Sequence, residues 1–215
     1  LLRDLGAMYR DGKTMAATEL GEPQSYEQYV QWSQSAEQLK KSRVDANYWT
    51  SVFQQPYQEF ELPSAHPRPA TKTYVAGHLV AFIDESLTSR LRDASRSQNC
   101  TLFSFLLSSF KIWIQRVTQQ EDIVVGVPMA SQPTINSSKI SDGSLLVGHC
   151  VNMLPIRSQC PPTESFHEIL ERLNKNVLDS LYHQNFTFGN LLGTLQIKRD
   201  TSRVPIISAS FNLAN

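Results

Sequence analysis

Residues 145–157 read Leu-Leu-Val-Gly-His-Cys-Val-Asn-Met-Leu-Pro-Ile-Arg, and this stretch decides the fold. Its Leu, Val and Ile content predicts a buried strand. His149, Asn152 and Arg157 interrupt the apolar run, and a buried polar group needs a hydrogen-bond partner. They are therefore either hydrogen-bonded structural residues or members of a site that the strand presents. Regular alternation places His149 and Asn152 on opposite faces, so we expect at most one of them to face a given pocket.

Strand and helix patterns alternate on both sides of this stretch. The other expected strands cover residues 74–83, 122–130 and 204–213. The expected helices cover residues 85–97, 101–117, 163–181 (capped by Thr163) and 188–195. Residues 101–117 are apolar nearly all round, so we place this helix at the centre of the core. The alternation predicts an α/β (α+β) two-layer sandwich.

The N-terminal third follows a different pattern. Apolar residues at helical spacing predict a helix from Leu1 to Tyr9, and Ser25 can cap a long helical segment that reaches Phe53. Prolines recur between residues 56 and 73, which excludes a helix and predicts an extended connector. Residues 131–143 are rich in Ser, Asn and Asp and predict a loop long enough to carry function.

Composition excludes several classes of partner and site. Twenty basic and twenty acidic residues cancel, so we expect neither a nucleic-acid nor a membrane partner. The three cysteines show no CxxC spacing and no nearby His pair, which disfavours a disulfide framework and a metal site. The sequence starts without Met or a signal peptide and has no apolar run of membrane-spanning length. We expect an internal piece of a longer cytoplasmic protein.

Common catalytic signatures are absent from the sequence. There is no phosphate-binding glycine loop, GxSxG elbow, HExxH helix or calcium-binding loop. Five histidines are scattered along the chain with no adjacent pair, and for each of them a structural role is the favoured interpretation.

Six motifs, taken in order, resemble those of the condensation domains of nonribosomal peptide synthetases, within the chloramphenicol-acetyltransferase-like superfamily. The segments that carry the resemblance, each with the family pattern that it matches, are residues 26–32 (YxDYAxW), 62–69 (LPxDxPRP), 101–130 (the TLF helix and VVGxPxA strand), 147–157 (VGxFVNTLxxR), 182–188 (HQDxPFE) and 199–205 (RDxSRxP). Gln28 replaces an Asp of the first motif, and Gly189 stands where an acid is common. Ser131-Gln132 stands near the position where family members often carry an Arg.

The resemblance implies an architecture and a reaction. It implies a chloramphenicol-acetyltransferase-like subdomain with a mixed sheet, in which residues 1–70 are the tail of the first subdomain and the connector. Residues 71–215 are then the second subdomain, incomplete at its end. The implied reaction is amide formation between aminoacyl or peptidyl thioesters, which carrier domains deliver on 4′-phosphopantetheine, with no cofactor bound directly. The implied partners are these carrier domains, the first condensation subdomain and an adjacent adenylation domain.

The family's catalytic HHxxxDG motif is absent from these 215 residues. No catalytic residue is therefore assigned, and we expect the chain alone to be inactive. An epimerisation or cyclisation relative on the same fold, or a non-catalytic carrier-docking module, remains an alternative.

By resemblance, the residues of the substrate tunnel and its floor loop are Ser131, Gln132, Gly148, His149 and Asn152. Asn152 can position a thioester carbonyl or a pantetheine amide, but a cross-strand hydrogen bond is favoured. Structural or carrier-facing roles are expected for Arg157, Arg199, Asp200 and Arg203, where each Arg can bind a carboxylate or the phosphopantetheine phosphate. A local salt-bridge network is favoured for residues 199–203. Packing, rather than substrate contact, is expected for Tyr26, Tyr29 and Trp32.

Overall fold

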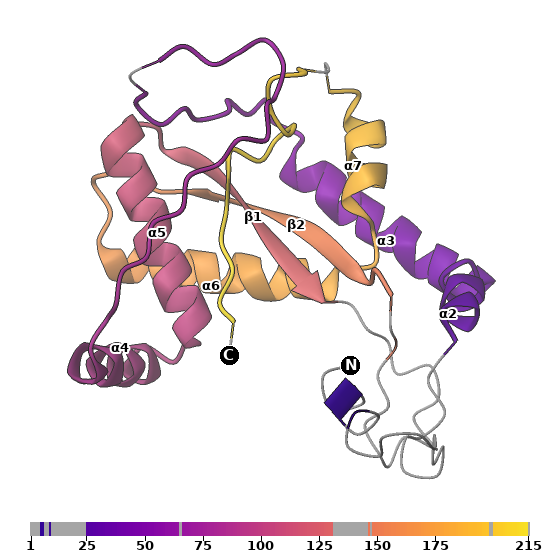
Figure 1. The fold of residues 1–215 in the computed structure, drawn as a ribbon, viewed down its shortest axis with the longest axis horizontal. Coiled ribbons are helices and arrows are strands. Elements are labelled where there is room, and N and C mark those ends of the chain that lie inside the picture. The colour runs from indigo at the N-terminus through magenta and orange to yellow at the C-terminus, as the bar shows by residue number, and fades with distance from the viewer. Residues whose placement is uncertain are drawn as a thin grey trace.

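The structure, a computed structural model, describes residues 5, 6, 9, 25–64, 66–130, 146, 148–197 and 200–214. Its helices are α2 (Tyr26–Ser33), α3 (Ala36–Val52), α4 (Glu85–Ser97), α5 (Leu102–Thr118), α6 (Phe166–Tyr182) and α7 (Phe188–Leu195). Its strands are β1 (Asp122–Ala130), β2 (Val151–Gln159) and β3 (Ala209–Ser210). In Figure 1 the strands cross the middle of the molecule, with α6 along β2 and α5 beside β1.

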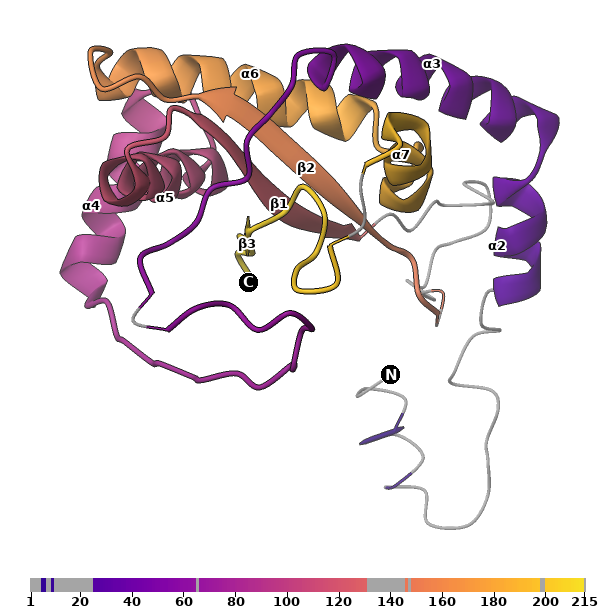
Figure 2. The ribbon, with the colours of Figure 1, turned by 90° about the horizontal axis from the view of Figure 1, so that it is seen from above.

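The sheet is mixed, with the order β2-β1-β3. β1 pairs with β2 antiparallel along its whole length, from Asp122 opposite Gln159 to Ala130 opposite Val151. It pairs with β3 in parallel, with Val125 opposite Ala209. Seen from above, α6 and α3 lie along one side of the strands, whereas residues 66–84 loop out on the other side (Figure 2). The predicted layered α/β fold with a mixed sheet is confirmed.

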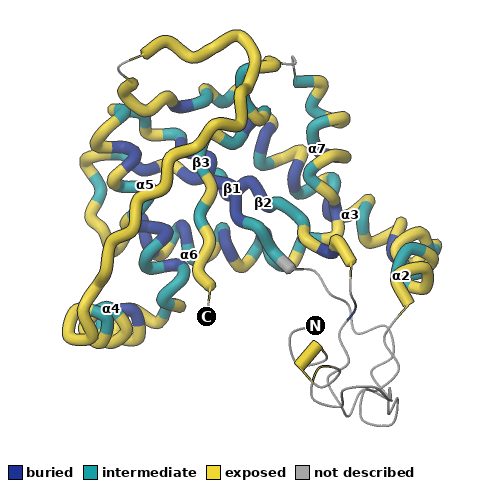
Figure 3. The backbone as a smooth tube through the Cα atoms, viewed as in Figure 1, coloured by how far each residue is buried: buried dark blue, intermediate teal, exposed yellow. Residues whose placement is uncertain are grey.

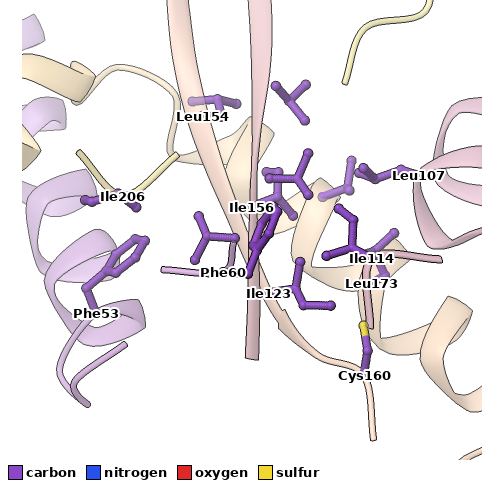
Figure 4. Packing of buried hydrophobic residues seen from close by; sticks show 14 of the residues in the cluster. Phe53, Phe60, Leu107, Ile114, Ile123, Leu154, Ile156, Cys160, Leu173 and Ile206 are labelled. Atoms are coloured by element: carbon purple, nitrogen blue, oxygen red, sulfur yellow. The ribbon is translucent and has the colours of Figure 1, made fainter. Parts of the chain in front are cut away.

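The hydrophobic core lies between the strands and the helices (Figure 4). Its fully buried members include Leu107 and Ile114 of α5, Ile123 of β1 and Leu173 of α6. Trp113 of α5 is nevertheless 50% exposed, so this helix is buried on fewer sides than its composition predicts.

Aromatic residues before residue 70 belong to the same core. Trp49, Phe53 and Phe60 pack in one cluster with the strands. The predicted division of the chain at residues 70 and 71 stays a prediction, but the polypeptide on both sides of it shares this core.

One charged side chain, Lys111 of α5, is fully buried in that core. Its Nζ donates to Ile123 O at 3.1 Å, to Ile156 O at 2.7 Å and to Ser158 Oγ at 2.7 Å. The amine therefore joins α5 to both long strands. Burial lowers the pKa of Lys111 to about 7, because removing the ammonium from water disfavours its charged form.

Helix starts differ from two predictions. The long segment expected after Ser25 is divided into α2 and α3, and the Ser25 side chain makes no capping hydrogen bond. Ser35 caps α3 by accepting from Gln38 N. Likewise Ser165, not Thr163, caps α6, because it forms a reciprocal capping box with Glu168.

Three strand predictions also need correction. Residues 74–83 are extended but join no sheet among the described residues, and they are exposed throughout (Figure 3). The strand expected at 204–213 pairs only at Ala209–Ser210. The strand expected from residue 145 begins at Val151 and continues to Gln159.

The other predicted elements have mixed outcomes. α4, α7 and β1 have the predicted bounds, and the connector between residues 56 and 73 is neither helix nor strand where it is described. Of the helix expected from Leu1 to Tyr9, residues 5, 6 and 9 are described and are helical. The loop at 131–143 lies outside the described residues. No helix in the described part is long and apolar enough to cross a bilayer.

Candidate functional site

A cavity of about 570 Å³ lies between α2, the start of β2 and the segment that leads into α7. We call it the aromatic cavity and define it by its lining residues in 26–33, 38–42, 149–153 and 184–190. It brings together three motifs that lie far apart in the sequence, at residues 26–32, 147–157 and 182–188. Figure 2 shows α3 running past α7 to α2, and α3 contacts both of these helices.

Three aromatic rings of α2 form one wall of this cavity. The ring centroids of Tyr26 and Tyr29 are 5.5 Å apart, and those of Tyr29 and Trp32 are 5.9 Å apart and stacked. The spacing of three residues places all three rings on one helix face. They pack on one another as expected, but they also line the cavity, and Tyr26 is 41% exposed. Packing alone is thus an incomplete description of them.

Gly148 is required by the position of Tyr26. A Cβ added at Gly148 would lie 2.2 Å from Cδ2 and 2.4 Å from Cε2 of the Tyr26 ring, so a larger residue there would force the ring to move. The Tyr26 hydroxyl donates to the carbonyl oxygen of His149 at 3.3 Å. Gly148 therefore shapes the cavity indirectly, by leaving room for the Tyr26 ring that lines it. The His149 side chain is exposed.

Asn152 holds the segment that forms the opposite wall. Its Nδ2 donates to Gln184 O at 2.9 Å and Phe186 O at 3.2 Å, and its Oδ1 accepts from Phe188 N at 3.1 Å. Both amide hydrogens are committed, which favours the structural alternative. The hydrogen bonds reach residues 184–188 rather than a neighbouring strand. Asn152 and His149 line the same cavity, because His149 precedes the regular strand on which the alternation argument rested.

A second anchor of this segment, Asp45 of α3, was missed by the sequence analysis. Its carboxylate lies 2.9 Å from His183 Nδ1 and accepts from Asn185 N at 3.0 Å and Asn185 Nδ2 at 3.1 Å. Trp49 Nε1 donates to His183 O at 2.8 Å. The sequence contains a single indication of this role, which is that Asp45 lies one helical turn before Trp49. Residues 183–188 are therefore fixed from two sides, by α3 and by β2.

Arg157 is committed to the fold by all five of its N–H groups. Nε and Nη2 donate to the Asp122 carboxylate, with the shortest contact 2.6 Å. Nη1 donates to Val52 O and Gln55 O, and Nη2 also donates to Pro56 O. The guanidinium thus closes the C-terminal end of α3 onto the edge of the sheet. This geometry favours the structural alternative for Arg157 over a phosphate contact.

The ion pairs of Arg203 join the connector to the turn before β3. Its Nη1 lies 3.1 Å from Glu59, its Nη2 2.5 Å from Glu61, and its Nε 2.9 Å from Asp200. The expected network is present here, and it extends to the connector as well as to its sequence neighbour. Three predicted site residues, Ser131, Gln132 and Arg199, lie outside the described residues.

Acidic, Lys and Arg side chains are absent from the described lining of the aromatic cavity. Tyr29 also stays neutral at physiological pH, because burial, together with the neighbouring Cys150, raises the pKa of its phenol. Within the described ranges, no group of three metal-ligating side chains comes together. The site can therefore hold a neutral group between aromatic faces and amide side chains.

Comparison with known proteins places the chain in a family. The family model described as Condensation domain matches residues 1–215. Surfactin synthase subunit 1 of Bacillus subtilis (strain 168) is 31% identical over 217 residues, which is 100% of this chain and 6% of that protein.

Solved structures share the fold. The condensation domain from Monacolin K polyketide synthase MokA superimposes with a TM-score of 0.72 at 21% identity, over 86% of this chain and 44% of that one. The X-domain in its complex with OxyB from teicoplanin biosynthesis has a TM-score of 0.75 at 19% identity, over 87% of this chain and 41% of that one. The chain thus spans less than half of these structures. With a family model matched from end to end and this fold, the chain belongs to the condensation domain family of nonribosomal peptide synthetases.

Proposed function

We propose that this chain forms one wall of an amide-forming acyltransferase site in a longer synthetase. The amine nitrogen of one carrier-bound acyl group attacks the thioester carbonyl carbon of another. The new C–N bond forms, the C–S bond breaks, and the thiol leaves with the proton that the amine gives up. The observation that carries the proposal is the end-to-end family match, together with the single cavity at which three of the motifs meet.

The described residues bind and orient rather than transfer protons. A thiolate is a good leaving group, so holding two tethered reactants together supplies much of the acceleration. Asp45 and Asn152 fix one wall of the aromatic cavity, while Gly148 and Tyr26 fix the other. The HHxxxDG motif that the family places at the reacting centre is supplied, in this proposal, by polypeptide outside these 215 residues.

Only the neutral part of the phosphopantetheine arm that carries each substrate fits the aromatic cavity. Its amides and thioester match an uncharged cavity with amide side chains such as Gln38 and Asn190. Its phosphate needs a cation, and Arg157 has no N–H left to give. Carrier domains, the first condensation subdomain and an adenylation domain are the proposed partners. The three free thiols support a reducing compartment such as the cytoplasm.

A second candidate function is docking without turnover. The teicoplanin X-domain was solved as a complex with OxyB and shares this fold. Gln28 and Gly189 depart from the condensation pattern. In this alternative the domain holds a carrier or partner and makes no amide.

Product analysis separates these functions. The longer synthetase that contains this chain is supplied with two loaded carriers, and the carrier-bound products are released and quantified. We expect the amide-linked product. Carrier binding without product supports docking, while a change of stereochemistry or a heterocycle in place of the simple amide supports an epimerisation or cyclisation relative.

A further inference from the structure

We propose that Glu59 is a positioning residue for the amide-forming reaction, because it fastens a strained turn at residues 205–207 to the connector and makes the two move together. The inference rests on the proposed function for its reaction. It adds a residue outside the aromatic cavity on which the geometry of the reaction depends, and it gives that residue no contact with substrate.

The connector is held from two sides at residues 59–61, which read Glu-Phe-Glu. Phe60 is 2% exposed and lies in the hydrophobic core (Figure 4). Both acids instead bind the guanidinium of Arg203. Oε2 of Glu59 accepts from Nη1 at 3.1 Å, and Oε1 of Glu61 accepts from Nη2 at 2.5 Å. The core and Arg203 together therefore fix this part of the connector.

The other partner of Glu59 is a turn with an unfavourable backbone. Ile206 has a φ of 68°, and the Ile207 N–H donates to Pro205 O at 2.8 Å, so residues 205–207 form the rare γ-turn whose central φ is positive. A β-branched residue such as Ile seldom adopts a positive φ. Strain of this kind persists only where the surrounding structure enforces it, and it concentrates at functional sites. The turn therefore needs a contact that holds it.

Glu59 supplies that contact. Its Oε1 accepts from the Ile206 N–H at 3.0 Å, while its Oε2 binds Arg203. Hydrogen bonds to a charged acceptor are the stronger kind, and the Glu59 side chain is only 20% exposed. Glu61 is 60% exposed and accepts no hydrogen bond from Ile206. One carboxylate of the pair thus holds both Arg203 and the turn, and the other holds Arg203 without the turn.

The polypeptide on both sides of the turn is attached to other elements. Before the turn, Thr201 Oγ1 donates to Ala70 O at 2.7 Å, and the Lys72 N–H donates to Thr201 O at 2.9 Å. After the turn, the Phe211 N–H donates to Gly126 O at 2.9 Å and extends the two-residue contact of β3 with β1. A movement of the turn would therefore shift both the far end of the connector and β3.

This linkage bears on the reaction because of where the connector leads. In the proposed function the catalytic histidine lies in polypeptide that precedes this chain. The covalent path from there to the sheet runs through α2, α3 and the connector. A displacement of about 1 Å far from the reacting atoms can cost on the order of a hundredfold in rate. Glu59 thus acts on the chemical step through geometry and leaves carrier binding unchanged.

Steady-state kinetics of the longer synthetase with loaded carriers test the inference. We expect Glu59→Gln, which keeps the size of the side chain and removes its charge, to lower kcat about tenfold and to change KM by less than about twofold. Glu61→Gln is the matched control, because it weakens a contact to the same Arg203 without touching the turn, and it should keep both constants within about twofold of the parent. An unchanged kcat for Glu59→Gln, or equal losses in the two variants, overturns the inference.

Hydrogen exchange of the same synthetases, followed on peptides that contain Ile206, Lys72 and Phe211, tests the linkage itself. We expect Glu59→Gln to accelerate exchange about tenfold at all three N–H groups together. Acceleration at Ile206 alone would give Glu59 a local structural role and would overturn the inference.

A second variant covers the case in which Glu59→Gln does not fold. Thr201→Val removes an exposed hydroxyl at the other attachment of the connector and keeps the shape of the side chain. Because coupling between two sites is reciprocal, exchange at the Ile206 N–H should accelerate about threefold in this variant. Unchanged exchange at Ile206 in Thr201→Val contradicts the linkage.

The outcome is separable from that of the proposed function. Amide formation by the longer synthetase, with an unchanged kcat in Glu59→Gln, rejects Glu59 as a positioning residue and leaves the proposed function standing. Coupled exchange in a synthetase that makes no amide supports the linkage and rejects the proposed function.

Discussion

At the scale of single residues, Arg157 shows why a cation lies near the end of an apolar strand. Its side chain is 9% exposed and touches an acid and three carbonyl oxygens, so the positive charge is compensated by groups that themselves need donors. The Arg157 guanidinium thereby joins the C-terminal end of α3 to the edge of the sheet.

Replacing this cation tests the junction. Arg157→Met should lower the free energy of unfolding by about 3 kcal/mol, because Asp122 and the carbonyl oxygens lose their partner. Denaturant titration measures it, with Arg90→Met on the exposed face of α4 as the matched control, expected within about 0.5 kcal/mol of the parent. A loss below about 1 kcal/mol for Arg157→Met would contradict the structural role.

Lys111 gives stability an unusual dependence on pH. Its pKa is about 7 in the folded chain, against an ordinary value of 10.5, so above pH 7 unfolding takes up a proton at this amine. The free energy of unfolding therefore rises with pH between 7 and 10, by up to about 1.4 kcal/mol per pH unit.

Comparison with Lys111→Met isolates this contribution. Chemical unfolding is measured at pH 7, 8 and 9. The free energy of unfolding of the parent should increase relative to that of the variant as the pH is raised. Parallel curves for the two proteins would mean that the buried amine keeps its proton.

At the scale of elements, the segment 183–188 is a loop that two buried polar groups hold in place. Asp45 fixes its start from α3, and Asn152 fixes its end from β2. The aromatic cavity thus depends on the position of α3 as well as on the sheet.

Asp45→Asn tests this dependence with little change of shape. The new amide turns donors toward the donors of Asn185, so the segment should loosen. Hydrogen exchange should accelerate at the Asn185 N–H by about tenfold or more while the N–H groups at the middle of β1 keep their protection. Unchanged exchange at Asn185 would argue against Asp45 as an anchor.

Residues 74–83 are an element whose partner is missing from the described structure. Leu79 is 93% and Phe82 95% exposed, although both faces of the segment have the apolar character of a buried strand. Such an edge pairs readily with other chains.

Phe82→Lys should therefore reduce self-association, measured by sedimentation, while it changes the free energy of unfolding by less than about 0.5 kcal/mol. A loss of several kcal/mol would mean that Phe82 is packed in solution.

The same segment explains what the sequence can and cannot predict. β1 and residues 74–83 share a strand composition, yet only β1 has neighbours in the described structure, and composition does not reveal a partner. Thr163 and Ser165 are both good caps, and the side chain of Glu168 decides between them. Local patterns were sufficient for α4, α7 and β1.

The site was less predictable than the elements because its contacts are long-range. The motifs at residues 26–32 and 147–157 were identified separately, but their contact depends on a glycine that admits a ring from a helix more than a hundred residues earlier.

At the scale of the whole molecule, the central proposal is that this chain forms one wall of the reaction site. Arg157 and Arg203 are held by structural partners, and the described lining residues of the aromatic cavity include no Asp, Glu, Lys or Arg. The chain spans 6% of surfactin synthase subunit 1 and 44% of the MokA condensation domain. The proposed division of labour follows: these residues position an acyl group, and other polypeptide supplies the catalytic histidine.

The most direct test is to measure amide formation from two loaded carriers by the 215-residue chain alone and by the longer synthetase in which a HHxxxDG motif precedes it. The account predicts product from the longer protein and none from the chain alone. Amide formation by the chain alone, above the uncatalysed rate, would contradict the placement of catalysis outside it.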